Sequence, residues 1–119
     1  YRLEVEGISI LHVGDLGHML PQEVINAVSP IDILMVPVGG TFTVDAKEAY
    51  EISKALTPKV IIPMHYWVKG MNLPLAPLDS FLSLVDYEVI KLGTNEWNIS
   101  RGDLEVMGPE PKVVVFNPP

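Results

Sequence analysis

Two side chains with metal-binding chemistry each follow an apolar run, although they lie far apart in the sequence. Asp15 comes shortly after the run that ends at Val13, and His65 comes directly after the run that ends at Met64. Carboxylate and imidazole are ligands that Zn²⁺ prefers and that Mn²⁺ or Fe²⁺ accepts. A catalytic zinc needs about three protein ligands and one open position for water. The pair therefore suggests a part of a metal site and not a complete one.

The elements that precede Asp15 are predicted from apolar periodicity and from glycine. Residues 3–6 alternate apolar and charged, Gly7 allows a turn, and residues 8–13 continue as a second run. This pattern predicts a β-hairpin. A short helix is expected from Pro21, which suits a first helical turn, to the break at Pro30.

The elements that precede His65 follow the same logic. Residues 31–38 and 60–64 are nearly continuous apolar runs, typical of strands covered on both faces. Between them, Asp45 and Glu48 have the spacing of a capping box and predict a helix that ends before Pro58. Residues 8–64 thus alternate strand, helix, strand, helix and strand, which predicts an α/β fold with parallel strands and right-handed crossovers.

The rest of the chain continues this mixed pattern. A loop rich in glycine, proline and asparagine is expected from Trp67 to Pro77, and a helix at residues 78–85. Further strands are predicted at residues 87–92, 103–107 and 112–116.

The predicted fold brings the two candidate ligands to one place. In an open parallel sheet, ligands bind at the carboxyl ends of the strands, where the loops are free to carry polar groups. Three loops fall at this edge, and they are residues 14–18, 39–41 and 65–66. We therefore expect Asp15 and His65 at the same edge, although 65 − 15 = 50 residues separate them.

Composition excludes several classes of protein. The chain has 119 residues, of which 48% are apolar, and its formal charge is −7, so we predict one folded domain over residues 1–119. Eight scattered Lys and Arg residues form no basic stripe for nucleic acid or anionic lipid. With no run of ~18 apolar residues and no signal-peptide pattern, we expect a soluble protein, cytoplasmic by default. The absence of cysteine excludes disulfides and thiolate sites.

Three segments carry a resemblance to a known family. They are residues 11–18 (LHVGDLGH), 36–45 (VPVGGTFTVD) and 60–66 (VIIPMHY). In this order and spacing they resemble the carboxy-terminal half of a metallo-β-lactamase-fold hydrolase, in the branch that includes ascorbate-6-phosphate lactonase and related metal-dependent hydrolases. The resemblance covers roughly residues 1–67 well and the remainder in outline. It implies half of an αββα sandwich, with a mixed sheet and further carboxy-terminal strands.

The resemblance also implies roles for the two candidate ligands. In that family, one or two metal ions are bound, the Gly-Asp carboxylate bridges both, and a histidine after a later strand binds the second ion. Carried over, Asp15 is the bridging ligand and His65 the terminal ligand. The metal is expected to be zinc, with manganese or iron also compatible. A metal-bound hydroxide would attack an ester, lactone or phosphodiester of a small-molecule substrate.

This chain departs from the family in one respect. The family's His-x-His-x-Asp-His cluster and a further metal-binding histidine lie upstream of the Gly-Asp motif, and this sequence contains neither. The chain also begins at Tyr1 and not at Met. We therefore expect a fragment of a longer enzyme, inactive alone, or else a degenerate half. Either predicts that part of the sheet is exposed and is covered by the missing amino-terminal half or by self-association.

The remaining candidates have simpler interpretations. His12 is expected to be structural, and His18 either supports Asp15 or is a solvated loop residue. Gly39 and Gly40 could cradle a phosphate, but they lack the lysine and spacing of a P-loop and more simply allow a tight turn. Tyr66 is expected to cover the rim of a pocket or to donate to a substrate oxygen.

Two other functions remain open from the sequence. The first is a non-catalytic α/β interaction or self-associating module with no complete metal site. The second is a small nucleotide-binding or phosphate-binding domain that uses the glycines at 39 and 40.

Overall fold

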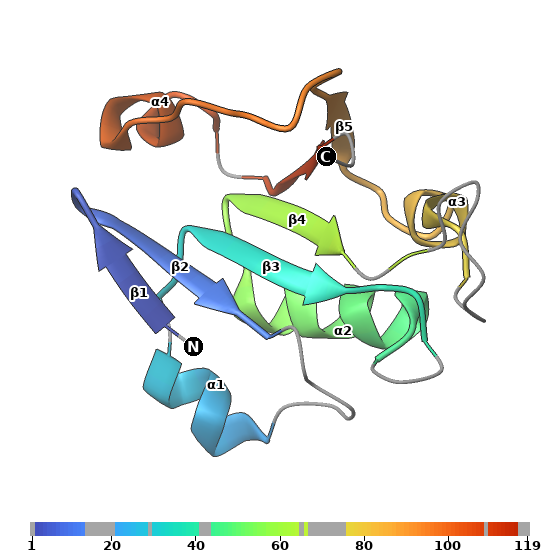
Figure 1. Cartoon of the computed structure of the whole chain (residues 1–119). Coiled ribbons are helices and arrows are strands. Elements are labelled where there is room, and N and C mark those ends of the chain that lie inside the picture. Colours follow the sequence, from blue (N-terminus) through green and yellow to red (C-terminus); the bar gives the residue numbers. More distant parts are fainter. Residues whose placement is uncertain are drawn as a thin grey trace.

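A mixed six-stranded sheet forms the centre of the molecule (Figure 1). The computed structural model describes residues 2–13, 21–28, 30–40, 44–64, 66, 76–108 and 110–116. The strand order is β1-β2-β3-β4-β6-β5. The strands are β1 (Arg2–Val5), β2 (Ile8–His12), β3 (Ile33–Pro37), β4 (Val60–Met64), β5 (Glu88–Lys91) and β6 (Lys112–Val115). The helices are α1 (Gln22–Val28), α2 (Ala46–Leu56), α3 (Leu78–Leu82) and α4 (Arg101–Glu105).

The sheet is parallel except at one edge. Strands β2, β3, β4, β6 and β5 run parallel, and β1 pairs antiparallel with β2. The β1–β2 turn consists of Glu6 and Gly7, which have φ values of 51° and 81°. Positive φ at both central residues is the signature of a type I′ hairpin turn, whose twist matches that of the flanking strands. The predicted hairpin and the predicted α/β fold with parallel strands are therefore confirmed.

One face of the sheet, here called the helix face, is defined by Leu11, Leu34, Ile61 and Val113 and is closed by helices. These residues are 0–4% exposed, and Ile25 of α1, Ile52 of α2 and Phe81 of α3 join the same buried cluster. Figure 1 shows α2 beneath β3 and β4 and α1 beneath the β1–β2 end of the sheet. Helix α2 begins at the predicted capping box, since Asp45 accepts from the Glu48 N–H and Glu48 accepts from the Asp45 N–H. Burial on this face supplies the main hydrophobic core.

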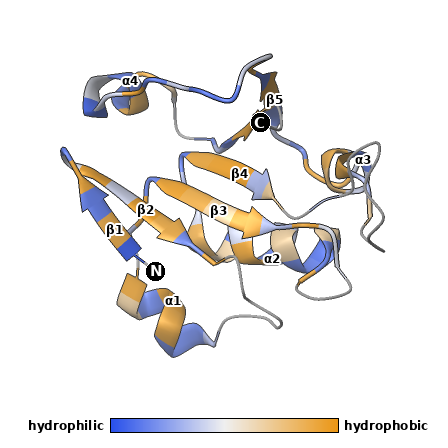
Figure 2. Cartoon of the chain, in the orientation of Figure 1, coloured by the Kyte–Doolittle hydropathy of each residue, from blue (hydrophilic) through white to orange (hydrophobic). Residues whose placement is uncertain are grey.

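The other face, here called the open face, is defined by Ile8, Ile10, Ile33, Met35, Val60 and Ile62, and the carboxy-terminal segment covers it in part. Leu104 of α4 is fully buried and packs with Ile8 and Ile33 near the amino ends of the strands. Further along, Ile10, Met35 and Ile62 are only half-buried. Figure 2 shows that strands β3 and β4 are apolar over most of their length, as expected for strands meant to be covered on both faces.

Two sequence predictions for the later part of the chain need correction. The strand predicted at residues 103–107 is wrong, because Arg101–Glu105 forms α4. The reason is a capping box in which Ser100 accepts from the Asp103 N–H and Asp103 accepts from the Ser100 N–H. The helix predicted at residues 78–85 is present but shorter, as α3 ends at Leu82. Strands β5 and β6 lie within the ranges predicted for them.

Candidate metal centre

The ends of the central strands are held in register at the edge where the candidate ligands were predicted. Beyond the strand ends, the Val13 N–H donates to the Met35 carbonyl (3.0 Å) and the Val38 N–H donates to the Met64 carbonyl (2.9 Å). Because β2, β3 and β4 are parallel and adjacent, Val13, Val38 and Met64 lie at one edge of the sheet. The pairing thus fixes the backbone just before each loop that was expected to carry chemistry.

The candidate ligands themselves, Asp15 and His65, lie outside the described residues, and so does His18. The structure gives the positions of their anchors: Asp15 follows Val13 by two residues, and His65 stands between Met64 and Tyr66. Strands β2 and β4 flank β3, so their ends are about 10 Å apart at the usual strand spacing. That Asp15 and His65 converge on one cation stays a prediction.

The described part of the chain holds no complete metal site of its own. Within residues 2–13, 21–28, 30–40, 44–64, 66, 76–108 and 110–116, no three His, Cys, Asp or Glu side chains are grouped so that they could hold a metal ion. His12 is half-buried within β2. A metal centre with three such ligands at this edge therefore needs at least one ligand from outside the described residues.

The two glycines after β3 serve the turn that leads into α2. Gly40 has a φ of 70°, and a Cβ on it would lie 3.3 Å from the Asp45 Cβ. Gly39 forms an isolated antiparallel bridge with Asp45, and the Gly40 N–H donates to the Val44 carbonyl (3.3 Å). A positive φ and a close approach to the N-cap residue both favour glycine. This geometry favours the turn interpretation over a phosphate cradle.

Tyr66 packs against the core, and the two roles expected of it, at a pocket rim or as a donor to a substrate oxygen, stay predictions. Its ring packs against the buried cluster of the helix face, and its hydroxyl donates to the Phe116 carbonyl (3.5 Å). Burial raises the pKa of this phenol above its ordinary value of 10.0, so the group stays neutral. Tyr66 thereby links the end of β4 to the end of β6.

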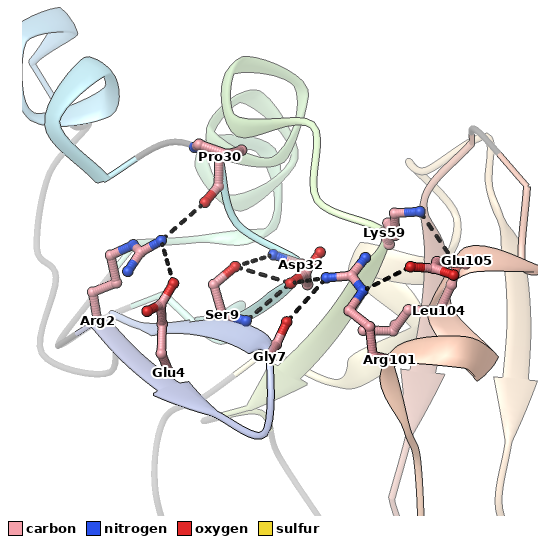
Figure 3. Close-up of polar contacts among 10 residues, drawn as sticks. All are labelled: Arg2, Glu4, Gly7, Ser9, Pro30, Asp32, Lys59, Arg101, Leu104 and Glu105. Atoms are coloured by element: carbon pink, nitrogen blue, oxygen red, sulfur yellow. Dashed lines mark hydrogen bonds and ion pairs between the residues drawn. The ribbon is translucent and has the colours of Figure 1, made fainter.

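A cluster of hydrogen-bonded polar side chains lies at the opposite end of the strands, just before their amino ends (Figure 3). The Asp32 carboxylate accepts from the Ser9 N–H (2.9 Å), the Ser9 hydroxyl (3.0 Å) and the Arg101 guanidinium (2.7 Å). Arg101 also donates to the Gly7 carbonyl (3.2 Å). Partial burial raises the pKa of Asp32, but the bonds from Ser9 and Arg101 outweigh it and hold that pKa below its ordinary value.

This polar group is structural and was missed by the sequence prediction. It joins the hairpin turn, the start of β3 and α4, three segments that are distant in the sequence. A signal was present, because Asp32 is the one acid within the apolar run at residues 31–38. Nothing in the sequence, however, identified Arg101 as its partner. In parallel sheets, ligands bind at the carboxyl ends of the strands, and this group lies at the other end.

Comparison with known proteins assigns the family. The beta-lactamase superfamily domain matches residues 1–65. This chain belongs to the beta-lactamase superfamily. The superfamily predicted from the three motifs is therefore confirmed, while the lactonase-like branch stays a prediction.

Members of this superfamily with similar sequences are named metal-dependent hydrolases. A UPF0173 metal-dependent hydrolase of Carboxydothermus hydrogenoformans is 41% identical over 66 residues, which are 56% of this chain and 29% of that protein. One from Thermoplasma acidophilum is 43% identical over 60 residues, which are 50% of this chain and 27% of that protein. The chain thus matches less than a third of the length of these relatives.

A superfamily member of known structure matches nearly the whole chain. It is a candidate Zn-dependent hydrolase of the metallo-beta-lactamase superfamily from Thermotoga maritima, with a TM-score of 0.78 and 41% sequence identity. The match covers 97% of this chain and 56% of the Thermotoga chain. The mixed six-stranded sheet with its helices therefore corresponds to part of a metallo-β-lactamase fold. No helix in the described residues is both long and apolar enough to cross a membrane.

Proposed function

We propose that this chain is the carboxy-terminal half of a metal-dependent hydrolase, and that Asp15 and His65 are two of its metal ligands. The observation that carries the proposal is the shared edge of Val13 and Met64, the anchors that precede the two residues. The names of the similar proteins support a metal-dependent hydrolase as the class.

The donor set indicates zinc and also indicates that the site is shared with another segment. One carboxylate and one imidazole suit Zn²⁺ and also admit Mn²⁺ or Fe²⁺. A catalytic zinc takes about three protein ligands, so at least one ligand besides Asp15 and His65 is needed. When bound, the cation would lower the pKa of water and supply hydroxide for attack on an ester, lactone or phosphodiester. In this proposal the intact enzyme binds two cations, with Asp15 between them.

In this proposal, the contribution of this chain is to anchor the segments that lead to its two ligands. Val13 and Met64 are tied to β3 by backbone hydrogen bonds, and the Tyr66 hydroxyl reaches Phe116. These contacts restrain the chain on the near side of Asp15 and on both sides of His65. A chain that is restrained next to its ligands would lose less conformational freedom when the metal binds. The isolated chain is expected to bind metal weakly and to have no hydrolase activity.

The open face indicates where the missing half would pack. Ile10, Met35 and Ile62 leave apolar surface accessible on three central strands that are otherwise mostly buried. Part of the matched Thermotoga chain has no counterpart here, because the match covers 56% of its length. In this proposal, an amino-terminal half covers the open face and supplies the remaining ligands.

Zinc binding to the purified chain tests the proposal. We expect Asp15→Ala and His65→Ala each to weaken zinc binding at least ~10-fold in equilibrium dialysis, because each removes a ligand. Matched controls are Asp86→Ala, an exposed acid after α3, and His12→Ala in β2, and both should leave the affinity unchanged. Unchanged binding in either ligand variant would contradict the assignment of that ligand.

The second candidate is an interaction module without a metal site, and the exposed edge strand favours it. Leu3 and Val5 of β1 are 56% and 52% exposed, which is unusual for neighbouring apolar residues of a strand. The dialysis experiment separates the candidates, because a module would bind zinc no better than its Asp15→Ala variant.

A further inference from the structure

Strand β1 forms an open edge of the sheet, and its side chains are exposed. Among the described residues, β2 is the one strand paired with it. Leu3 and Val5 are 56% and 52% exposed, and the Glu4 carboxylate side chain is 68% exposed. An edge strand offers unpaired N–H and C=O groups on which another strand can pair.

The hairpin geometry determines which backbone groups face outward. A two-residue turn makes Val5 and Ile8 a hydrogen-bonded pair, and in an antiparallel ladder such pairs alternate with non-bonded ones. Leu3, paired with Ile10, therefore also directs its N–H and C=O toward β2. The backbone groups of Arg2 and Glu4 consequently point to the open side.

We propose that β1 pairs antiparallel with β1 of a second copy of this chain, with Leu3 on the two-fold axis. In this register Arg2 of each copy lies opposite Glu4 of the other copy. The backbone N–H and C=O groups of Arg2 and Glu4 point outward, so both of these pairs are hydrogen-bonded pairs of the antiparallel ladder. Opposite charges directly across a ladder are stabilising. If one β1 strand were shifted along the other by two residues, Glu4 would lie opposite Glu4 of the second copy. A shift of one residue would place side chains from opposite faces of the two sheets across from each other.

The apolar side of β1 supports the same register. Leu3, Ile10, Ile33 and Val60 form one row across four strands, and the row ends at the exposed Leu3. Pairing on the two-fold axis places Leu3 against its own copy and continues the row into a second sheet. The proposal is independent of the metal site, because β1 and the loops after β2 and β4 are different segments.

A second copy fits this edge better than an unrelated strand does. Arg2 is a cation, Leu3 is apolar and Glu4 is an anion. A two-fold axis at Leu3 therefore places the cation of each copy opposite the anion of the other. The strand is short and supplies about four intermolecular backbone hydrogen bonds. The dimer is therefore weak, and it forms in a concentration-dependent equilibrium.

Single-cysteine cross-linking tests the register, since the chain has no cysteine of its own. Two cysteines at position 3 would have Cβ atoms about 5 Å apart, within reach of a disulfide after a small shift. Two cysteines at position 5 would lie about 13 Å apart along the strands. We expect Leu3→Cys to form disulfide-linked dimers at least ~10-fold faster than the equally exposed Val5→Cys. Equal rates would overturn the proposal.

Charge exchange provides the second test, measured by sedimentation equilibrium of the whole chain. Arg2→Glu and Glu4→Arg should each raise the dimer dissociation constant about 10-fold, and the double variant should restore it. Glu96→Arg, the same charge change in an exposed segment outside the sheet, should have no effect. A monomeric wild-type chain, or a double variant that fails to recover, would overturn the proposal.

A third variant guards against loss of folding. Arg2 also donates to the Val28 and Pro30 carbonyls, so Arg2→Glu could destabilise α1. Leu3→Arg changes an exposed residue and places two like charges across the axis. This variant should remain folded by circular dichroism and should be monomeric, and dimers of a folded Leu3→Arg variant would also overturn the proposal.

Discussion

Asp32 makes more hydrogen bonds and ion pairs than the other acidic residues labelled in Figure 3. It accepts bonds from both the backbone and the side chain of Ser9, and it pairs with Arg101 while its own side chain is 14% exposed. The Arg101 side chain is 36% exposed, so solvent screens the Coulombic part of this pair. The hydrogen bonds to a charged and mostly buried acceptor are therefore the larger contribution to stability.

Replacing Asp32 should destabilise the fold in a pH-dependent way. At pH 7 we expect Asp32→Asn to lower the free energy of unfolding by about 2 kcal/mol, as charged hydrogen bonds are lost. The pKa of Asp32 in the folded chain lies below its ordinary value of 3.8. The stabilisation is thus fully present above about pH 4 and is lost as the pH falls through the folded pKa. Urea titrations of both proteins at several pH values measure the difference.

The control for this prediction is an exposed ion pair. Glu51→Gln breaks the pair between Glu51 and Lys54, whose side chains are 48% and 46% exposed. We expect this change to cost less than ~0.5 kcal/mol at pH 7. If the difference in the free energy of unfolding between wild type and Asp32→Asn stayed constant down to pH 2, the lowered pKa of Asp32 would be contradicted.

At the scale of elements, the β1–β2 turn carries a residue that is poorly suited to its backbone. Glu6 has a φ of 51°, and a left-handed conformation costs most side chains about 1 kcal/mol, whereas asparagine tolerates it. Glu6→Asn should therefore raise the free energy of unfolding by about 0.5 kcal/mol in urea titrations. Glu96→Asn, with the same change in charge but no left-handed backbone, is the matched control. An equal effect of both variants would exclude the conformational explanation.

The helices and strands show which parts of the fold can be predicted from sequence patterns. The hairpin, α2 and β4 were predictable because Gly7, the Asp45–Glu48 capping box and an unbroken apolar run act locally. The segment around Leu104 was not, because a five-residue run with one buried residue suits a strand as well as a helix. The choice there was made by the cap at Ser100 and by Arg101, whose partner Asp32 lies 69 residues away.

The candidate site was predictable to a smaller extent. That Asp15 and His65 follow parallel strands at one edge could be inferred from glycine and apolar patterns, and the anchors Val13 and Met64 agree with it. The ligand geometry itself stays a prediction, since both residues lie outside the described ranges. Tyr66 could not be assigned from sequence, because its contact with Phe116 spans 50 residues.

At the scale of the whole molecule, the two faces of the sheet differ in how completely they are covered. On β3, Leu34 points to the helix face and is fully buried, whereas its neighbour Met35 points to the open face and is half-buried. The difference arises because α1 and α2 cover one face along the central strands, while α4 covers the other only near the amino ends. A partner segment would therefore bury more apolar surface on the open face than on the helix face.

Truncating these two neighbours should reveal that asymmetry. We expect Leu34→Ala to lower the free energy of unfolding by about 3 kcal/mol, because it leaves a cavity in a packed core. Met35→Ala should cost about 1 kcal/mol, because its side chain loses less buried area. Urea titrations of the isolated chain measure both, and equal costs would contradict an open face. In a longer protein that includes an amino-terminal half, the Met35→Ala cost should rise toward that of Leu34→Ala, because the covering segment would bury Met35 as deeply.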